Sequence, residues 1–142
     1  MTQLSRPRLE VKNLMRYFDG KAVVNDVSFS IKPGQVTCLL GPSGCGKSTT
    51  LRMIAGVDRQ DGGEIWADGA LVCDTVVSVP AEKRSIGLMF QDFALFPHLN
   101  VADNIAFGLT GSKAQKRDRV LDLLSKVGLA GKIEEYPHSL SG

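Results

Sequence analysis

The sequence has few of the features that crosslink proteins, bind metals or hold proteins in membranes. Its 142 residues include only three cysteines, and no Cys-x-x-Cys pair occurs among Cys38, Cys45 and Cys73. This argues against a disulfide framework or a zinc site and favours a reducing cytoplasm. No segment approaches the run of about 18 apolar residues that a membrane span needs, and residues 1–13 lack the apolar core of a signal peptide. If the protein works at a membrane, we expect it to dock on a partner already there.

Charge of one sign is also scarce. Seventeen Lys and Arg residues against 15 Asp and Glu residues give a net charge of +2, which is too small to indicate nucleic acid or an anionic membrane as a partner. Aromatic residues make up only 6% of the chain, and we find no internal repeat or low-complexity tract. With 43% hydrophobic residues and a length close to the usual ~150 per domain, the composition predicts one globular domain.

The hydrophobic pattern predicts strands first and helices later. Alternating residues at 9–14 and 22–31 are typical of half-buried strands, and 64–67 is a short strand after a turn. Nearly continuous apolar runs at 36–40 and 86–90 predict strands buried on both faces. Helical spacing is found at 46–55, 101–109 and 114–127. This order indicates an α/β core with a small β portion in front and a helical insertion behind.

One motif has a clear chemical meaning. Residues 41–48 match G-x-x-x-x-G-K-[ST] at every fixed position, and a predicted strand precedes them and a predicted helix follows them. The residues are Gly41, Pro42, Ser43, Gly44, Cys45, Gly46, Lys47 and Ser48.

Each part of the motif suits a nucleoside triphosphate. Glycines let backbone N–H groups approach phosphates and form an anion-binding nest, and the N-terminus of the following helix adds partial positive charge. Lys47 is expected to reach the β- and γ-phosphates, and the Ser48 hydroxyl to ligate Mg²⁺. The weaker alternative is a glycine-rich turn with an exposed lysine.

The order of the motifs resembles that of an ABC-transporter ATPase subunit over essentially the whole chain. The series consists of residues 41–49, ending at Thr49, then Phe90-Gln91-Asp92, then Ser139-Leu140-Ser141-Gly142. The resemblance implies an α/β P-loop NTPase core with an incomplete parallel sheet, an N-terminal antiparallel β subdomain and a helical insertion. In these terms, residues 1–90 hold the β subdomain and phosphate-loop core, and residues 91–142 hold the Q-loop and helical subdomain.

The resemblance also implies roles for residues outside the loop. Tyr17 is placed to stack on adenine, although a tyrosine near a turn is often only half-buried. Gln91, at the Q-loop position, would help to ligate Mg²⁺ and to sense the γ-phosphate, and a surface glutamine is the alternative. Ser141 and Gly142 match the start of the LSGGQ signature, which contacts ATP bound by a second subunit in a head-to-tail pair. Lys47 and Gln91 are the candidate catalytic residues.

A further stretch resembles bacterial importers fed by a solute-binding protein, including iron(III), polyamine, molybdate, thiamine and sugar systems. It comprises residues 80–84 and FQDFALFPHL at 90–99. The resemblance implies that transmembrane permease subunits dock on an apolar series formed by Phe93, Leu95, Phe96 and Leu99. The alternative is that these side chains pack in the core of the helical insertion. It places the protein in the cytoplasm, peripheral on the inner face of the membrane, with iron(III) and polyamine as first candidate solutes. His98 and His138 are not expected to bind metal.

The resemblance is incomplete at the C-terminal side. The rest of the signature, the Walker B aspartate, the catalytic glutamate and the switch histidine of the family are not in this sequence. Asp61, Glu64 and Asp68 do not follow a long apolar strand and cannot replace them. Hydrolysis by this polypeptide alone is therefore in doubt, and we expect a marginally stable or aggregation-prone chain.

Three functions remain open from the sequence. The first is an energy-coupling ATPase subunit, or part of one, for import of a small polar solute. The second is a truncated remnant with weak or no nucleotide binding. The third is a soluble ABC-type ATPase outside transport, against which the small net charge and the importer-like stretch argue.

Overall fold

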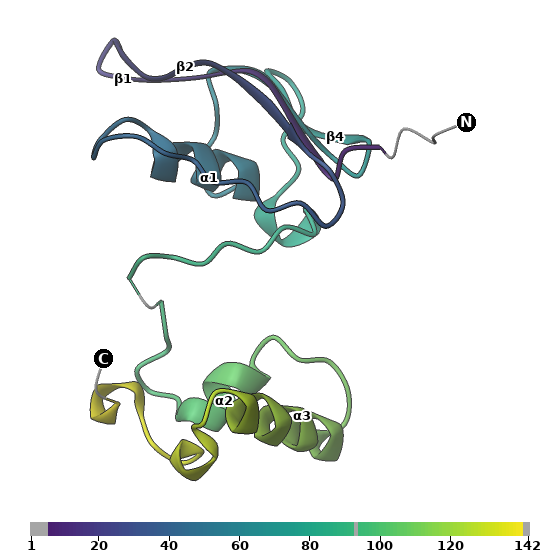
Figure 1. Ribbon diagram of the computed structural model, residues 1–142, viewed down its shortest axis with the longest axis vertical. Coiled ribbons are helices and arrows are strands. Elements are labelled where there is room, and N and C mark those ends of the chain that lie inside the picture. Colours follow the sequence, from purple (N-terminus) through teal and green to yellow (C-terminus); the bar gives the residue numbers. More distant parts are fainter. Residues whose placement is uncertain (1–5, 93, 141–142) are drawn as a thin grey trace. The chain divides into compact units, whose positions relative to one another are not determined.

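The computed structural model describes residues 6–92 and 94–140 of the chain. The chain divides into two compact units, residues 1–88 and 89–142, whereas the sequence placed a boundary between residues 90 and 91. The first unit combines a sheet with one helix, and the second is built of helices (Figure 1). None of the helices in the described part of the chain is long and apolar enough to cross a membrane.

The sheet of the first unit is antiparallel and has the strand order β2-β1-β3-β4. The strands are β1 (Leu9–Phe18), β2 (Lys21–Ile31), β3 (Gly62–Ala67) and β4 (Ala70–Cys73). Helix α1 (Lys47–Ala55) lies between β2 and β3 in the chain, and a 3-10 turn, η1 (Ala81–Lys83), follows β4. The predicted strands at 9–14, 22–31 and 64–67 and the predicted helix at 46–55 are confirmed, apart from shifts at their ends.

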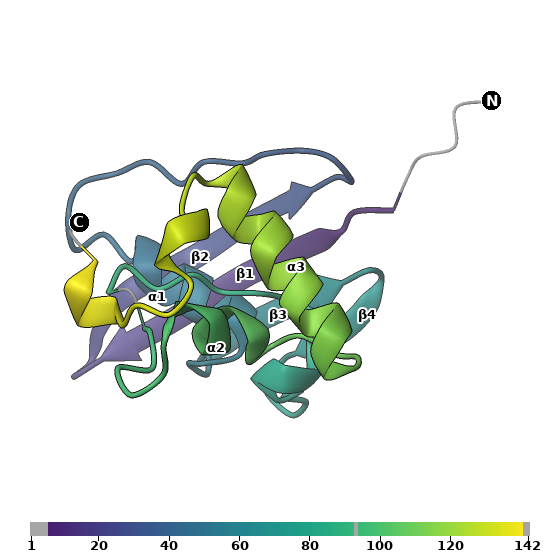
Figure 2. The same cartoon turned by 90° about the horizontal axis from the view of Figure 1, so that it is seen from below.

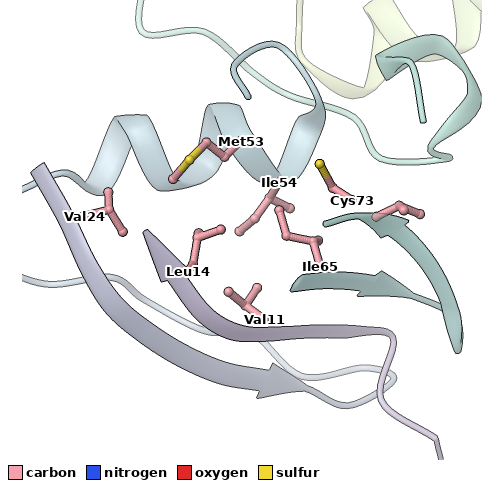
Figure 3. Close-up of a cluster of buried hydrophobic side chains, with 8 residues drawn as sticks. Val11, Leu14, Val24, Met53, Ile54, Ile65 and Cys73 are labelled. Atoms are coloured by element: carbon pink, nitrogen blue, oxygen red, sulfur yellow. The ribbon is translucent and has the colours of Figure 1, made fainter. Parts of the chain in front are cut away.

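The core of the first unit lies between α1 and one face of the sheet (Figure 3). Met53 and Ile54 of α1 pack against Val11 and Leu14 of β1 and Ile65 of β3. Val11 and Leu14 are three positions apart, so a regular strand would send them to opposite faces. An irregularity in β1 between these two residues, with Asn13 at a left-handed φ of 48°, turns both side chains inward.

The second unit has its own small core. Helices α2 (Val101–Ala106) and α3 (Lys113–Lys126) bury Val101, Val120 and Leu124 between them, with shorter turns η2 (Ala130–Lys132) and η3 (Pro137–Ser139) following. Both helices begin at capping side chains: Asn100 accepts from the Asp103 N–H, and Ser112 forms a capping box with Gln115. The helices predicted at 101–109 and 114–127 are confirmed, with ends that differ by up to three residues.

Two predicted elements are wrong. Segments 36–40 and 86–90 form no strand, and three of their apolar side chains are almost fully exposed: Val36 (89%), Leu40 (91%) and Met89 (95%). A strand exists only with a hydrogen-bonded neighbour, and neither segment has one within residues 6–92 and 94–140. The α/β class holds, but every strand pair described here is antiparallel, and the parallel part of the expected sheet is not formed.

Candidate phosphate-binding loop

The loop before α1 has the backbone that its glycines predict. Gly44 and Gly46 take left-handed φ angles of 80° and 91°, and Gly46 is the N-cap residue of α1. Gly46 is also buried against β2, where an added Cβ would overlap the carbonyl oxygen of Val23. Both conformation and space therefore require glycine at position 46. This contact packs the loop directly against β2.

Lys47 is folded back over the loop. Its Nζ donates to the carbonyl oxygens of Gly41 at 2.8 Å and Pro42 at 2.7 Å, and it lies 3.5 Å from the Cys45 Sγ. A positive charge is thus held where the loop begins, with neutral carbonyls as its main partners. Hydrogen bonds from an ammonium to phosphate oxygens are stronger than those to neutral carbonyls, so an anion in the loop can replace these partners.

The first turn of α1 also favours an anion. Gly46 has no side chain to cap the helix, and the first turn contains no acidic residue. The first hydrogen bond of the helix runs from the Thr50 N–H to the Gly46 carbonyl at 2.8 Å. The N–H groups of the first helical turn before Thr50 therefore have no acceptor within the helix and can bind other acceptors. Ser43 and Ser48 are exposed and Thr49 is half-buried. Ser48 offers a hydroxyl oxygen beside these donors, which fits a hard cation such as Mg²⁺ accompanying a phosphate.

A cavity of about 350 Å³ borders the loop, lined on one side by β2 and on the other by the start of α1. Val23, Val24 and Asn25 come from β2, while Gly46 and Lys47 come from the loop and helix. The other lining residues are Val27, Leu39, Leu40, Cys45 and Thr50. Lys47 and β2 therefore line the same cavity, and β2 is the strand that follows Tyr17 in the hairpin.

Tyr17 is the next-to-last residue of β1 and is 43% exposed. It pairs with Ala22 of β2, one residue before the Val23 carbonyl that Gly46 approaches. Figure 1 and Figure 2 both draw the β1–β2 turn and the loop before α1 at the same end of this unit. Tyr17 therefore lies ahead of β2, as predicted, but within β1 rather than after the first strand, and it belongs to the hairpin whose second strand the loop approaches.

The remaining sequence candidates lie elsewhere or are not described. Gln91 is exposed and belongs to the second unit. Ser141, Gly142 and Phe93 lie outside the described residues. His98 packs edge-on against Phe96, and His138 stacks on Tyr136, each with ring centroids 5.9 Å apart. Across the described ranges, no three His, Cys, Asp or Glu side chains gather as a metal site.

The sequence analysis missed two residues that support the loop and its surroundings. Asp61 bonds to the end of β1 that carries Tyr17. Arg84, only 3% exposed, donates to the carbonyls of Met53 and Ile54 at the C-terminal end of α1. Their partners are 30 or more positions away in the chain, and no local pattern of residues indicates such contacts.

The glycine loop and α1 form the loop-and-helix unit of a P-loop nucleotide-binding fold. Comparison with known families gives a match to the ABC transporter family over residues 24–142. The chain therefore belongs to the ABC transporter family.

Related proteins and structures agree with this assignment. The chain is 46% identical to the Fe(3+) ions import ATP-binding protein FbpC 2 of Pectobacterium atrosepticum, over 94% of this chain and 39% of that protein. It is 47% identical to the spermidine/putrescine import ATP-binding protein PotA of Nitrosospira multiformis, over 94% and 37% respectively. A dimeric bacterial ABC transporter cassette of known structure is similar with a TM-score of 0.79 and 28% identity, covering 94% of this chain and 63% of that one. The chain thus spans less than half the length of these two importer proteins.

Proposed function

We propose that this chain binds Mg-ATP as the energy-coupling ATPase subunit, or part of one, of an ABC importer. The observation that carries the proposal is the position of Lys47, whose ammonium is held over the glycine loop by two main-chain carbonyls. The loop, the first turn of α1 and Tyr17 then supply the three parts that ATP requires: N–H donors, a cation and an exposed aromatic face. A solved relative of this fold, 27% identical, is described as an ATP-binding cassette bound to ADP and Pi.

In this proposal the residues of the chain act by positioning and by charge. The loop amides and Lys47 hold the β- and γ-phosphates, and Tyr17 stacks on the base. Ser48 would hold Mg²⁺ from the protein side, and the family resemblance implies Gln91 as a second oxygen ligand. A Mg²⁺ ion held there would supply positive charge that offsets the charge of the phosphates. Gln91 is also the candidate residue for sensing the γ-phosphate.

The proposal includes partners. Ser141 and Gly142 would contact ATP held by a second ATPase subunit, which gives a head-to-tail pair. Permease subunits would dock around residues 93–99, which places the protein at the inner face of the membrane. The proposed cargo is iron(III) or a polyamine, because the relatives reported above carry those names. A solute-binding protein would take part only indirectly.

Mg-ATP is expected to stabilise the 142-residue chain against unfolding. At 100 times its dissociation constant, a ligand that binds only the folded state adds about 2.7 kcal/mol. The measurement is the urea or thermal midpoint with and without Mg-ATP, with Mg-AMP as a control that lacks the β- and γ-phosphates. No shift with Mg-ATP would favour the second candidate function, a remnant without nucleotide binding.

Asn104→Ala is expected to weaken docking to a permease without lowering ATP affinity. The Asn104 side chain accepts from the Phe96 N–H at 2.9 Å and donates to the carbonyls of Phe96, Leu99 and Asn100 at 2.9–3.1 Å, so it fixes the turn that displays Phe96. Its loss should cost about 1–3 kcal/mol and release that turn.

Co-purification with co-expressed permease subunits and Mg-ATP titration measure the two effects of Asn104→Ala. Asn100→Ser, which keeps a capping oxygen for α2, is the matched control. Unchanged permease capture by Asn104→Ala would count against this docking region, and ATPase activity without any permease association would favour a soluble ABC-type ATPase.

A further inference from the structure

We propose that Asp61 is a positioning residue for the nucleobase end of the site, because it fixes the segment of β1 that carries Tyr17. This inference rests on the proposed ATP function and concerns how this chain orients the base. Asp61 lies between the end of α1 and the start of β3, and the sequence pattern assigned it no role in the site.

Asp61 bonds to three consecutive residues of β1. Its N–H donates to the Met15 carbonyl at 2.9 Å, its Oδ1 accepts from the Arg16 Nη1 at 3.2 Å, and its Oδ2 accepts from the Tyr17 N–H at 2.7 Å. The bond to Tyr17 is therefore a charge-assisted hydrogen bond to the main chain of the residue proposed to stack on adenine.

The register of the sheet explains why a side chain is needed there. Pairing between β1 and β3 ends at Met15 and Gly62, while β1 continues to Phe18 beside β2. Tyr17 therefore lies beyond the last β3 residue, and no β3 carbonyl is available to its N–H. The Asp61 carboxylate takes the place of that missing carbonyl and extends the support of β1 by two residues.

The Arg16 contact strengthens the same clamp. The Arg16 Cζ lies 4.6 Å from the centroid of the Phe18 ring, and the Arg16 Nε is buried without a hydrogen-bond partner in the structure. Asp61 is its ion-pair partner, with 24% and 40% of the two side chains exposed. Removing the carboxylate thus releases Arg16 and the Tyr17 main chain together, on the side of β1 that faces away from β2. The Tyr17 main chain, which carries the ring, then loses its fixed position at the end of the hairpin.

A double-mutant cycle on the 142-residue chain tests the inference, with two probes: Mg-ATP, and Mg-tripolyphosphate, which has the phosphates but no base. Stacking on a base is typically worth a factor of about 5 to 150 in affinity. Tyr17→Ala should lower ATP affinity by such a factor, and Asp61→Ala by at least about 5-fold. The double variant should be no weaker than Tyr17→Ala, because Asp61 acts through Tyr17. Tripolyphosphate affinity should stay within about 2-fold of wild type in all three.

Two further variants separate positioning from general damage. Asp68 makes two of these three kinds of contact beside the other end of β1, with Arg8: its N–H bonds to the Arg8 carbonyl at 3.0 Å and its carboxylate to the Arg8 guanidinium at 2.8 Å. Asp68→Ala should therefore leave ATP affinity unchanged. Asp61→Asn keeps an oxygen that can accept from the Tyr17 N–H, so it should restore most of the affinity lost in Asp61→Ala.

Different results overturn different statements. Wild-type ATP affinity in Asp61→Ala, additive losses in the double variant, or an equal loss of ATP and tripolyphosphate would each overturn the positioning role and leave the proposed function intact. Binding of neither probe by the wild-type chain would overturn the proposed function, and this inference with it.

Discussion

Lys47→Ala is expected to lower the affinity of the chain for Mg-ATP by at least about 100-fold. Each hydrogen bond to a charged group is worth about 1.5–3 kcal/mol, so the loss of two phosphate contacts exceeds the ~2.7 kcal/mol that corresponds to 100-fold. The two carbonyls that Lys47 now binds, those of Gly41 and Pro42, belong to exposed residues and can turn to water. The free energy of unfolding should therefore fall by no more than about 2 kcal/mol.

The measurement for Lys47→Ala is titration with Mg-ATP and with Mg-tripolyphosphate, alongside a urea midpoint. Both ligands should be lost together, because Lys47 acts on the phosphates rather than on the base. Lys83→Ala, at an exposed lysine of η1, is the matched control and should bind both ligands as the wild type does. Equal ATP affinity in wild type and Lys47→Ala would remove Lys47 from the proposed site.

The loop was predictable from the sequence because its chemistry depends on fixed local spacing. Glycines at 44 and 46 take the left-handed angles that the motif requires, and α1 begins at Lys47. Helices α2 and α3 were predictable for a similar reason, since apolar spacing and capping residues are local signals. Structures that depend on interactions between neighbours in the chain can be predicted from the sequence of that segment alone.

The errors concern contacts between distant segments. Residues 36–40 and 86–90 are apolar enough for buried strands, but pairing depends on a neighbour that apolar runs do not identify. The short strand β4 was missed, although Asp68-Gly69 marks the turn before it. Asp61 bonds to Tyr17, which is 44 positions away in the chain. Arg84 bonds to Met53 and Ile54, which are 31 and 30 positions away. Their roles follow from the packing of α1 and β1, which the sequence pattern does not specify.

Arg84→Ala is expected to cause the largest loss of stability among the variants considered. Arg84 Nη1 donates to the Met53 carbonyl at 2.8 Å and the Ile54 carbonyl at 3.1 Å, and its Nε donates to the Val79 carbonyl at 2.7 Å. Removing a partner of buried polar groups costs about 1–3 kcal/mol for each group left unsatisfied. A total of about 3 kcal/mol or more is a large part of the 5–15 kcal/mol typical of a folded protein.

Urea unfolding followed by circular dichroism measures the loss of stability in Arg84→Ala. Arg59→Ala is the matched control, because Arg59 makes one long bond of 3.4 Å to the Thr75 carbonyl at an exposed position and should change stability by less than about 0.5 kcal/mol. Arg84→Lys should recover only part of the loss, since an ammonium lacks the planar fork that reaches the helix end and the Val79 carbonyl together. Wild-type stability in Arg84→Ala would contradict the prediction.

The site of Arg84 also explains why a loss there should reach the loop. α1 ends at a left-handed Gly56, where an added Cβ would lie within 3 Å of the Arg84 guanidinium, so helix end and side chain are packed as one unit. The same helix presents Lys47 at its other end and buries Met53 and Ile54 in the core. A guanidinium at the C-terminal end of α1 also offsets the partial negative charge of the helix there. Arg84→Ala is therefore expected to weaken Mg-ATP and Mg-tripolyphosphate binding to the same degree, whereas Asp61→Ala should affect only the ligand with a base.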